Sequence, residues 1–86
     1  MNSVEILGAV AGFVTTLTFV PQVIKTFRER KAHDVSLMMF IIAAVNEVMW
    51  IAYGALKSPP DMVIVLTNAV ILALSCTMII LKLKFK

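Results

Sequence analysis

Long hydrophobic stretches, separated by short charged connections, dominate this chain. Residues 6–24 and 62–81 contain no charged side chain, and residues 35–56 contain one, Glu47. Each stretch approaches the roughly 20 residues with which a helix crosses the hydrocarbon core of a membrane. Lipid cannot satisfy exposed amide groups and three strands cannot close a barrel, so helix is the only backbone structure open to these segments. The pattern predicts an all-α membrane protein with three transmembrane helices.

Composition excludes a soluble domain. The chain has 86 residues, of which 60% are hydrophobic, and a soluble domain this small cannot bury so much apolar surface. Glu5 is the only early charge, so the first stretch lacks the basic leader of a signal peptide, and we interpret it as a permanent span. We expect one transmembrane domain over residues 1–86, with spans over about 4–27, 36–57 and 60–83.

The basic residues are concentrated in two places. Four lie between the first and second stretches and three follow the third, whereas the connection between the second and third holds one. The positive-inside rule therefore places the first connection and the C-terminus in the cytoplasm and the N-terminus outside. The net charge of +3 reflects this topology and not nucleic-acid binding, because no folded domain presents these residues. They are Lys25, Arg28, Arg30, Lys31, Lys57, Lys82, Lys84 and Lys86.

Both connections carry signals for the start of a helix. Asp34 or Ser36 can cap the second helix by accepting hydrogen bonds from its first amides. The Ser-Pro-Pro-Asp sequence at 58–61 predicts Ser58 as the N-cap of the third helix, with Asp61 at the capping-box position. Each proline restricts the residue before it, which leaves the position of this cap open.

Trp50 and Asn68 lie at the same depth below one membrane face. Trp50 is seven residues before Lys57, and Asn68 is seven residues after Asp61. A rise of about 1.5 Å per helical residue puts both side chains about 10 Å inside the same boundary. An aromatic face and an amide at one level form a candidate site of the size of a sugar. The alternative is structural, since Trp is common near membrane interfaces and Asn joins neighbouring helices.

Polar or small residues recur at helical spacing on each predicted span, which places each set on one helix face. For Gly8 and Gly12 the alternative is close helix packing. Three helices are too few to enclose a polar path and also shield it from lipid. We therefore expect a dimer, in which these stripes of polar and small residues from two copies face one cavity. The stripes are Gly8, Gly12, Thr15, Phe19 and Gln22; Ala43, Asn46, Trp50, Tyr53 and Lys57; and Asp61, Asn68 and Ser75.

Pro21 interrupts the first span, four residues before Lys25. Proline has no backbone donor, so the carbonyl group of Leu17 loses its usual partner and a kink follows. The kink is either static or a hinge for the inner end of the helix. Gln22, the next residue, can hydrogen-bond across helices.

Three motifs resemble bacterial SemiSWEET sugar transporters of the PQ-loop superfamily. They are residues 15–22 (TTLTFVPQ), 50–54 (WIAYG) and 67–70 (TNAV), and the resemblance covers nearly the whole chain. It implies a parallel homodimer in the cytoplasmic (inner) membrane of a bacterium, in which each protomer has the helix order 1-3-2. It also implies alternating access to a central sugar pocket that contains Trp50 and Asn68 of both copies.

The same resemblance implies moving parts. Pro21, with Gln22 beside it, would form the hinge for alternating access. The outer gate would contain Tyr53, Lys57 and Asp61, and the inner side would be narrowed by Phe19 and Met39.

The chain departs from the family pattern in two places. Pro59 and Pro60 lengthen the second connection, which argues against a direct ion pair between Lys57 and Asp61. Asn46 and Glu47 stand where family members carry apolar or small residues.

Glu47 lies about 15 Å deep, near the bilayer midplane, where a charge costs about 2.5–3.5 kcal/mol. It must therefore be protonated, paired or in contact with water. We consider both a hydrogen bond to a neighbouring helix and, together with Asn46, a contact with substrate.

These observations predict a passive carrier of mono- or disaccharides. The alternatives are a PQ-loop carrier of amino acids or another polar metabolite, and a small accessory or pore-forming membrane subunit. We expect no enzyme activity, cofactor or metal, because His33 has no partner at metal-ligand spacing and there is no nucleophile–base set or phosphate-binding loop. Cys76 is the only cysteine, so no disulfide can form within the chain.

Overall fold

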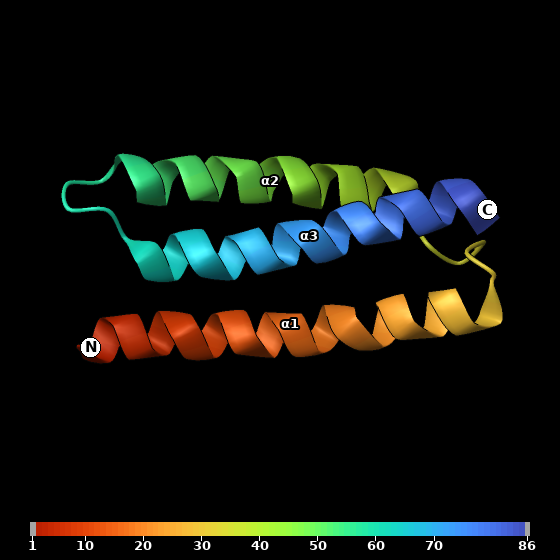
Figure 1. The fold of residues 1–86 in the computed structure, drawn as a ribbon, viewed down its shortest axis with the longest axis horizontal. Coiled ribbons are helices and arrows are strands. Elements are labelled where there is room, and N and C mark those ends of the chain that lie inside the picture. The colour runs from red at the N-terminus through yellow and green to blue at the C-terminus, as the bar shows by residue number, and fades with distance from the viewer. Residues whose placement is uncertain (1, 86) are drawn as a thin grey trace.

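The computed structural model describes residues 2–85 as three long helices, α1 (Ser3–Glu29), α2 (Leu37–Leu56) and α3 (Met62–Phe85). Figure 1 shows α3 between α1 and α2, and α3 packs against both. This arrangement confirms the all-α prediction and the 1-3-2 order. All three helices are long and apolar enough to cross a membrane. Lys86, part of the predicted basic C-terminal cluster, lies outside the described residues.

The bundle is 42 Å long, close to the roughly 40–45 Å thickness of a bilayer with its headgroups. Its two ends differ (Figure 1). Loop 57–61 joins α2 to α3 at the end where the N-terminus lies, and we call this the short-loop end. Loop 30–36 joins α1 to α2 at the opposite end, beside the C-terminus, and we call this the long-loop end.

Side chains and backbone geometry set the helix boundaries of α1 and α2. Asn2 caps α1, its side-chain oxygen accepting a hydrogen bond of 2.8 Å from the Glu5 amide. Arg30 ends α1 in the left-handed conformation, and its amide donates to the Thr26 carbonyl. Ser36 caps α2 by accepting from the Met39 amide at 3.2 Å. Of the two candidate caps for this helix, Ser36 is therefore the one that acts.

The predicted cap of α3 was wrong. The helix begins at Met62, and Asp61 is its cap: Asp61 Oδ1 accepts from the Ile64 amide at 3.2 Å. Ser58 and both prolines lie in the loop before it. The physical reason is that proline restricts the residue before it to extended backbone, so two in succession delay the helix until both have passed. The Asp61 amide instead donates to the Gly54 carbonyl at 2.9 Å.

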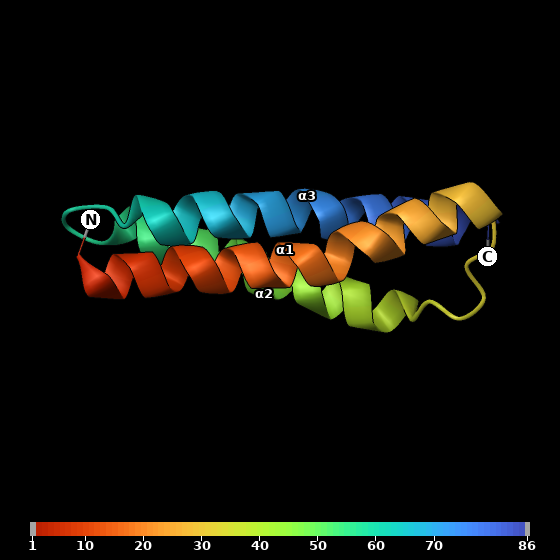
Figure 2. The same ribbon diagram turned by 90° about the horizontal axis from the view of Figure 1, so that it is seen from below.

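Pro21 lies inside α1, which remains helical on both sides of it. Figure 2 shows α1 changing direction within its orange second half, as expected where proline removes one backbone hydrogen bond. The first half of α1 follows α3 closely.

Glycines allow the close approach of α1 to α3. A side-chain carbon added at Gly12 would lie 2.5 Å from Thr67 Cγ2, and one at Gly8 would lie 3.4 Å from Val63 Cγ1. A carbon at 2.5 Å does not fit without movement of the neighbour, so the packing interpretation of these glycines is confirmed at Gly12. The absence of a side chain there brings α3, with Asn68, close to α1.

Helix α3 contributes half of the buried residues among those that the structure describes. Its buried residues Ile71, Ser75, Met78 and Leu81 recur along one face. Large apolar side chains on all three helices are exposed, as suits a surface that meets lipid or another protein. The centre of the bundle is therefore a stripe of α3 between two helices that cover its sides.

Candidate functional site

A groove of about 460 Å³ opens between the three helices in the half of the bundle nearer the short-loop end. It contains the four residues that the sequence singled out for substrate contact, Trp50, Asn68, Asn46 and Glu47. The remaining residues that line it are Gly8, Ala11, Gly12, Thr15, Val63, Ile64, Thr67 and Ile71. The structure thus assembles an aromatic ring, two amides and a carboxyl group in one place, and their role in binding stays a prediction.

Trp50 offers an accessible ring at the edge of the groove. It is 45% exposed, and the ring of Tyr53, one turn further along α2, packs edge-to-face against it with the centroids 5.5 Å apart. Because Tyr53 supports one side of the indole, the ring is held in position while part of its surface stays open. A planar surface of this kind is suited to the apolar face of a sugar ring.

Asn68 is oriented by its own helix. Its side-chain nitrogen donates to the Ile64 carbonyl one turn back, at 2.9 Å. Its side-chain oxygen has no hydrogen-bond partner among the described residues, and Asn68 lines the groove. The oriented amide therefore presents an acceptor, which can receive a hydrogen bond from a ligand hydroxyl.

Glu47 is 5% exposed, and its Oε1 accepts a hydrogen bond of 2.8 Å from the hydroxyl group of Ser75. The helix contact considered from the sequence is therefore present. Counting residues from the short-loop boundary would place the two at different depths, because Ser75 is fourteen residues after Asp61 and Glu47 is ten before Lys57. Side chains lean toward the N-terminus of their helix, and α2 and α3 run in opposite directions (Figure 1), so these two lean toward each other.

The predicted outer-gate residues lie together at the short-loop end. Lys57 Nζ is 3.7 Å from Asp61 Oδ2, so the expectation that the prolines prevent this pair was wrong. The turn that the Asp61 amide makes onto the Gly54 carbonyl brings the loop back on itself despite its added length. Lys57 Nζ also lies 5.5 Å from the centre of the Tyr53 ring, which connects the ion pair to Trp50 through aromatic contacts.

The predicted inner-gate residues are placed differently. Phe19 of α1 packs edge-to-face on Phe40 of α2, with ring centroids 5.8 Å apart. Met39, the neighbour of Phe40, is 68% exposed. Phe40 is thus a contact residue that the sequence reasoning missed. Its signal was weak, since one phenylalanine in a hydrophobic stretch does not stand out.

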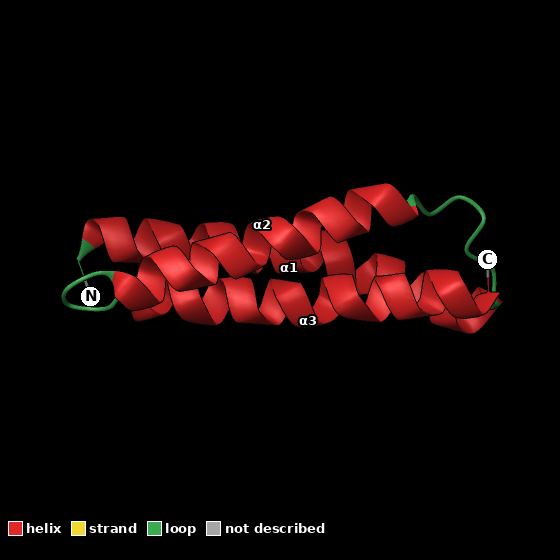
Figure 3. Cartoon of the chain, turned by 90° about the horizontal axis from the view of Figure 1, so that it is seen from above, coloured by secondary structure: helices red, strands yellow, loops and turns green. Residues whose placement is uncertain are grey.

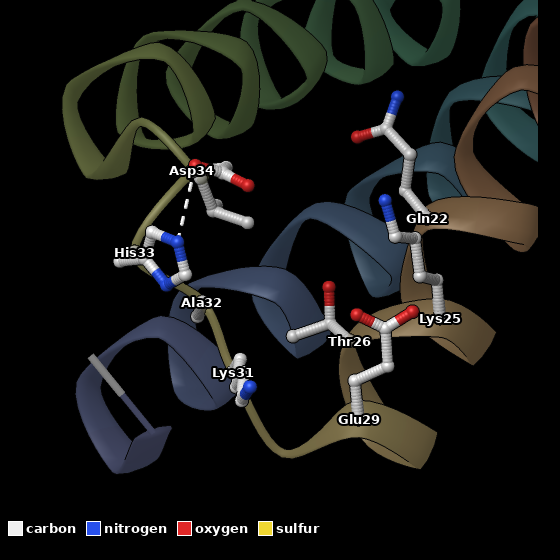
Figure 4. A pocket seen from close by; sticks show the side chains of 9 residues that line it. Gln22, Lys25, Thr26, Glu29, Lys31, Ala32, His33 and Asp34 are labelled. Carbon is white, nitrogen blue, oxygen red and sulfur yellow. Dashed lines mark ion pairs between the residues drawn. The ribbon is translucent and has the colours of Figure 1, made fainter.

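A second, smaller cavity of about 200 Å³ lies at the long-loop end, between the last turns of α1 and loop 30–36. Figure 4 shows the side chains of Gln22, Lys25 and Glu29 directed into it from α1, with His33 and Asp34 opposite. His33 Nε2 lies 3.4 Å from Asp34 Oδ1. Gln22, predicted beside the hinge, is therefore in this cavity and not in the groove with Trp50.

Loop 30–36 is anchored to the end of α3. Lys82 Nζ donates to the Ala32 carbonyl at 2.7 Å, and Ala32 is 1% exposed. The same carbonyl accepts from the Val35 amide at 3.0 Å. Lys82 was identified from the sequence only as part of a basic cluster, because a contact to a backbone carbonyl 50 residues away leaves no pattern in the sequence.

Fold and groove together define a three-span, multi-pass membrane protein with a polar groove between its helices. The family model described as PQ loop repeat matches residues 3–63. The Sugar transporter SemiSWEET of Escherichia coli (strain UMEA 3162-1) is 35% identical over 83 residues, which cover 96% of this chain and 91% of the relative. The protein of the same description from Bradyrhizobium diazoefficiens is 32% identical over 82 residues, with coverage of 95% and 93%.

Solved structures give the same result. One described as a bacterial homologue of SWEET transporters has a TM-score of 0.89 and 32% identity, covering 99% of this chain and 100% of that one. Another, described as SemiSWEET in the inward-open conformation, has a TM-score of 0.80 and 35% identity, with coverage of 96% and 87%. The chain belongs to the PQ-loop family and, within it, to the SemiSWEET proteins.

Proposed function

We propose that this chain transports sugars across a membrane by alternating access, as a carrier and not as an enzyme. The observation that supports this most directly is the groove itself, in which Trp50, Asn68 and Asn46 surround a space between three membrane-spanning helices. Relatives that match more than nine tenths of the chain are sugar transporters by description, and one similar structure is inward-open. An apolar sugar face would lie on Trp50 while hydroxyl groups bond to the amides.

The functional unit is a parallel homodimer. A groove on one three-helix protomer is open on one side, and sugar hydroxyl groups need polar partners all round if they are to leave water. A second copy related by a two-fold axis would cover the groove with an identical set of residues. Exposed apolar side chains on the groove side of α2, such as Met49 and Tyr53, are suited to this contact.

The two ends of the bundle close the sugar path in turn. Tyr53, Lys57 and Asp61 form the gate at the short-loop end, where the ion pair already exists within one protomer. Phe19 and Met39 narrow the path at the long-loop end, where the exposed Met39 is available for contact with a second copy. The basic residues at the long-loop end support a cytoplasmic position for it, with the N-terminus outside. The bacterial relatives support location in an inner membrane.

Pro21 and Gln22 form the hinge of this movement. The bend in α1 separates the half that packs along the groove from the half that carries Gln22 and Lys25 to the other cavity. Pro21→Ala restores a backbone donor and should stiffen α1. We expect uptake several times slower with sugar binding largely unchanged. Normal uptake by Pro21→Ala would show that the bend is static.

A carrier of amino acids or of another polar metabolite is the second candidate, and Glu47 in the groove is the observation that favours it. Uptake of labelled sugars and amino acids into liposomes that contain only the purified chain tests both candidates. We expect saturable sugar uptake. Saturable uptake of amino acids alone would select the second candidate, non-saturating flux would indicate a pore, and no uptake of any solute would indicate an accessory subunit.

A further inference from the structure

One carboxylate oxygen of Glu47 has no protein partner. Oε1 is bonded to Ser75, but Oε2 has no hydrogen bond among the described residues. No side-chain nitrogen or oxygen in that part of the chain is both shielded from solvent and unpartnered, so Oε2 must be accessible. Because Glu47 is only 5% exposed and lines the groove that contains Trp50 and Asn68, we infer that Oε2 is reached from this groove. The site therefore offers one strong acceptor beyond its amides.

Among residues 2–85, no basic side chain forms an ion pair with this carboxyl group. None of the residues that line the groove is Lys, Arg or His. The lysines at the ends of the two helices that carry Glu47 and Ser75 are engaged elsewhere, Lys57 with Asp61 and Lys82 with the Ala32 carbonyl. A carboxyl group near the bilayer midplane is costly to ionise without a cation. A positively charged ligand would supply what the protein does not.

We propose that the groove selects sugars that carry an amino group, with Glu47 as the residue that determines this specificity. The proposal rests on the proposed sugar transport and adds the class of sugar. The ammonium group donates to Glu47 Oε2, while Ser75 holds Oε1. A hydrogen bond between charged partners is about twice as strong as one between neutral groups. The accessible ring of Trp50, one turn along α2, also attracts a cation through its face.

An amino sugar fits these groups better than an amino acid. Glu47 would attract the amino group of an α-amino acid as well, but such a ligand also brings a carboxylate, for which the groove has no basic residue. The hydroxyl groups of a sugar instead meet the amides of Asn46 and Asn68. In a two-fold dimer the cavity contains a second Glu47, which strengthens the preference for a cation.

Trp50 provides a direct measurement because it is the only tryptophan in the chain. Its fluorescence in lipid nanodiscs is titrated with glucosamine, glucose and N-acetylglucosamine, which differ in the group at one ring position. The titration is made at about pH 6.5, below the pKa of about 7.7–8.0 typical of an α-amino group. We expect glucosamine to bind at least about tenfold more tightly than either neutral sugar, the factor that one charge-assisted hydrogen bond supplies.

Glu47→Gln removes the charge and keeps the shape of the side chain. We expect this variant to bind the three sugars within about threefold of one another. Glu5→Gln is the matched control, because Glu5 lies at the start of α1 and does not line the groove. It should keep the preference for glucosamine. Inhibition of labelled glucose uptake into liposomes by glucosamine and by N-acetylglucosamine gives the same comparison for transport.

The outcomes separate the two proposals. Equal binding of glucosamine and glucose by the wild-type chain overturns the amine preference while leaving sugar transport intact, and this comparison needs no variant. A preference that persists in Glu47→Gln overturns the role of Glu47. Binding of amino acids in place of amino sugars overturns the choice of ligand class. Absence of binding and uptake for every sugar overturns the proposed function as well.

Discussion

The two ends of the bundle are held together by different means. At the short-loop end, five residues join α2 to α3, the Asp61 amide bonds to the Gly54 carbonyl, and Gly54 is buried against α3. At the long-loop end, loop 30–36 is anchored to α3 by one lysine. Figure 3 shows α2 and α3 together at the first end and diverging toward the second. Backbone contacts thus join α2 to α3 at one end, whereas one side-chain hydrogen bond and the buried Ala32 hold the loop at the other.

This difference bears on where a moving part can be. Helices that diverge can move relative to each other at lower cost than helices joined by packed backbone. Pro21, the bend of α1 and the smaller cavity all lie toward the long-loop end. We therefore expect the movement within a protomer to be concentrated there, while α2 and α3 keep their arrangement at the short-loop end.

The largest effect should come from substitutions in the groove, because the proposed gates at both ends control access to it. Trp50→Ala or Asn68→Ala removes the ring or the oriented amide from the site, and a site built for hydroxyl groups loses its ligand when such partners are removed. We expect sugar uptake to fall at least about tenfold in either variant. Uptake into liposomes at wild-type rate by both would remove the groove from the pathway.

Gly54→Leu tests the backbone contact at the short-loop end. A carbon added at Gly54 would lie 3.0 Å from Ile64 Cγ2 and 3.1 Å from the Asp61 carbonyl oxygen, so a leucine must push α2 and α3 apart. We expect a loss of about 1–3 kcal/mol in stability, as for overpacked cores, measured by denaturant unfolding in detergent. Ala55→Leu, at an exposed neighbouring position, is the control. Equal stability of both variants would contradict tight packing at this end.

Lys82→Met tests the single anchor at the long-loop end. Loss of a hydrogen bond from a charged donor, about 1.5–3 kcal/mol, should speed amide exchange in loop 30–36 about tenfold or more. Loop 57–61 should exchange as before. Lys84→Met is the control, because the Lys84 ammonium lies over the Phe85 ring. Faster exchange at both loops would mean that the two ends are coupled and not independent.

Lys57→Met should have the smallest effect. The Lys57 side chain is 43% exposed and that of Asp61 is 25% exposed, and ion pairs of this kind contribute about 0–1 kcal/mol because water and salt screen them. We expect stability to change by less than about 1 kcal/mol and uptake by less than about fivefold, because Tyr53 and the bond of the Asp61 amide to the Gly54 carbonyl still close this end. A loss of uptake greater than tenfold would show that the ion pair, and not the backbone turn, closes this end.

Regular features of the sequence were enough to predict the helices and to place Trp50 and Asn68 at one level. Charge-free stretches mark the spans because the membrane requires them, and equal distances from Lys57 and Asp61 placed Trp50 and Asn68 at one level. The 1-3-2 order came from family resemblance and not from periodicity. The predictions of the spans and of the common depth of Trp50 and Asn68 rest on constraints that act along one helix or on all membrane helices alike.

Contacts between particular atoms of different segments were not predictable. The Glu47–Ser75 bond depends on the opposite lean of side chains on antiparallel helices, and the Lys82–Ala32 bond joins a side chain to a distant backbone group. The start of α3 was misplaced because the capping pattern favoured Ser58, whereas the prolines hold the backbone extended as far as Asp61. Each case needs coordinates, since several partners are compatible with the same spacing.

The odd number of spans constrains how such units can be joined by gene fusion. The described chain starts at the short-loop end and finishes at the long-loop end, about a membrane thickness away (Figure 1). The C-terminus of one copy therefore lies on the opposite side of the membrane from the N-terminus of a second copy that points the same way. A fused protein with two parallel units needs an additional membrane crossing as its linker, whereas an antiparallel pair would need only a short loop.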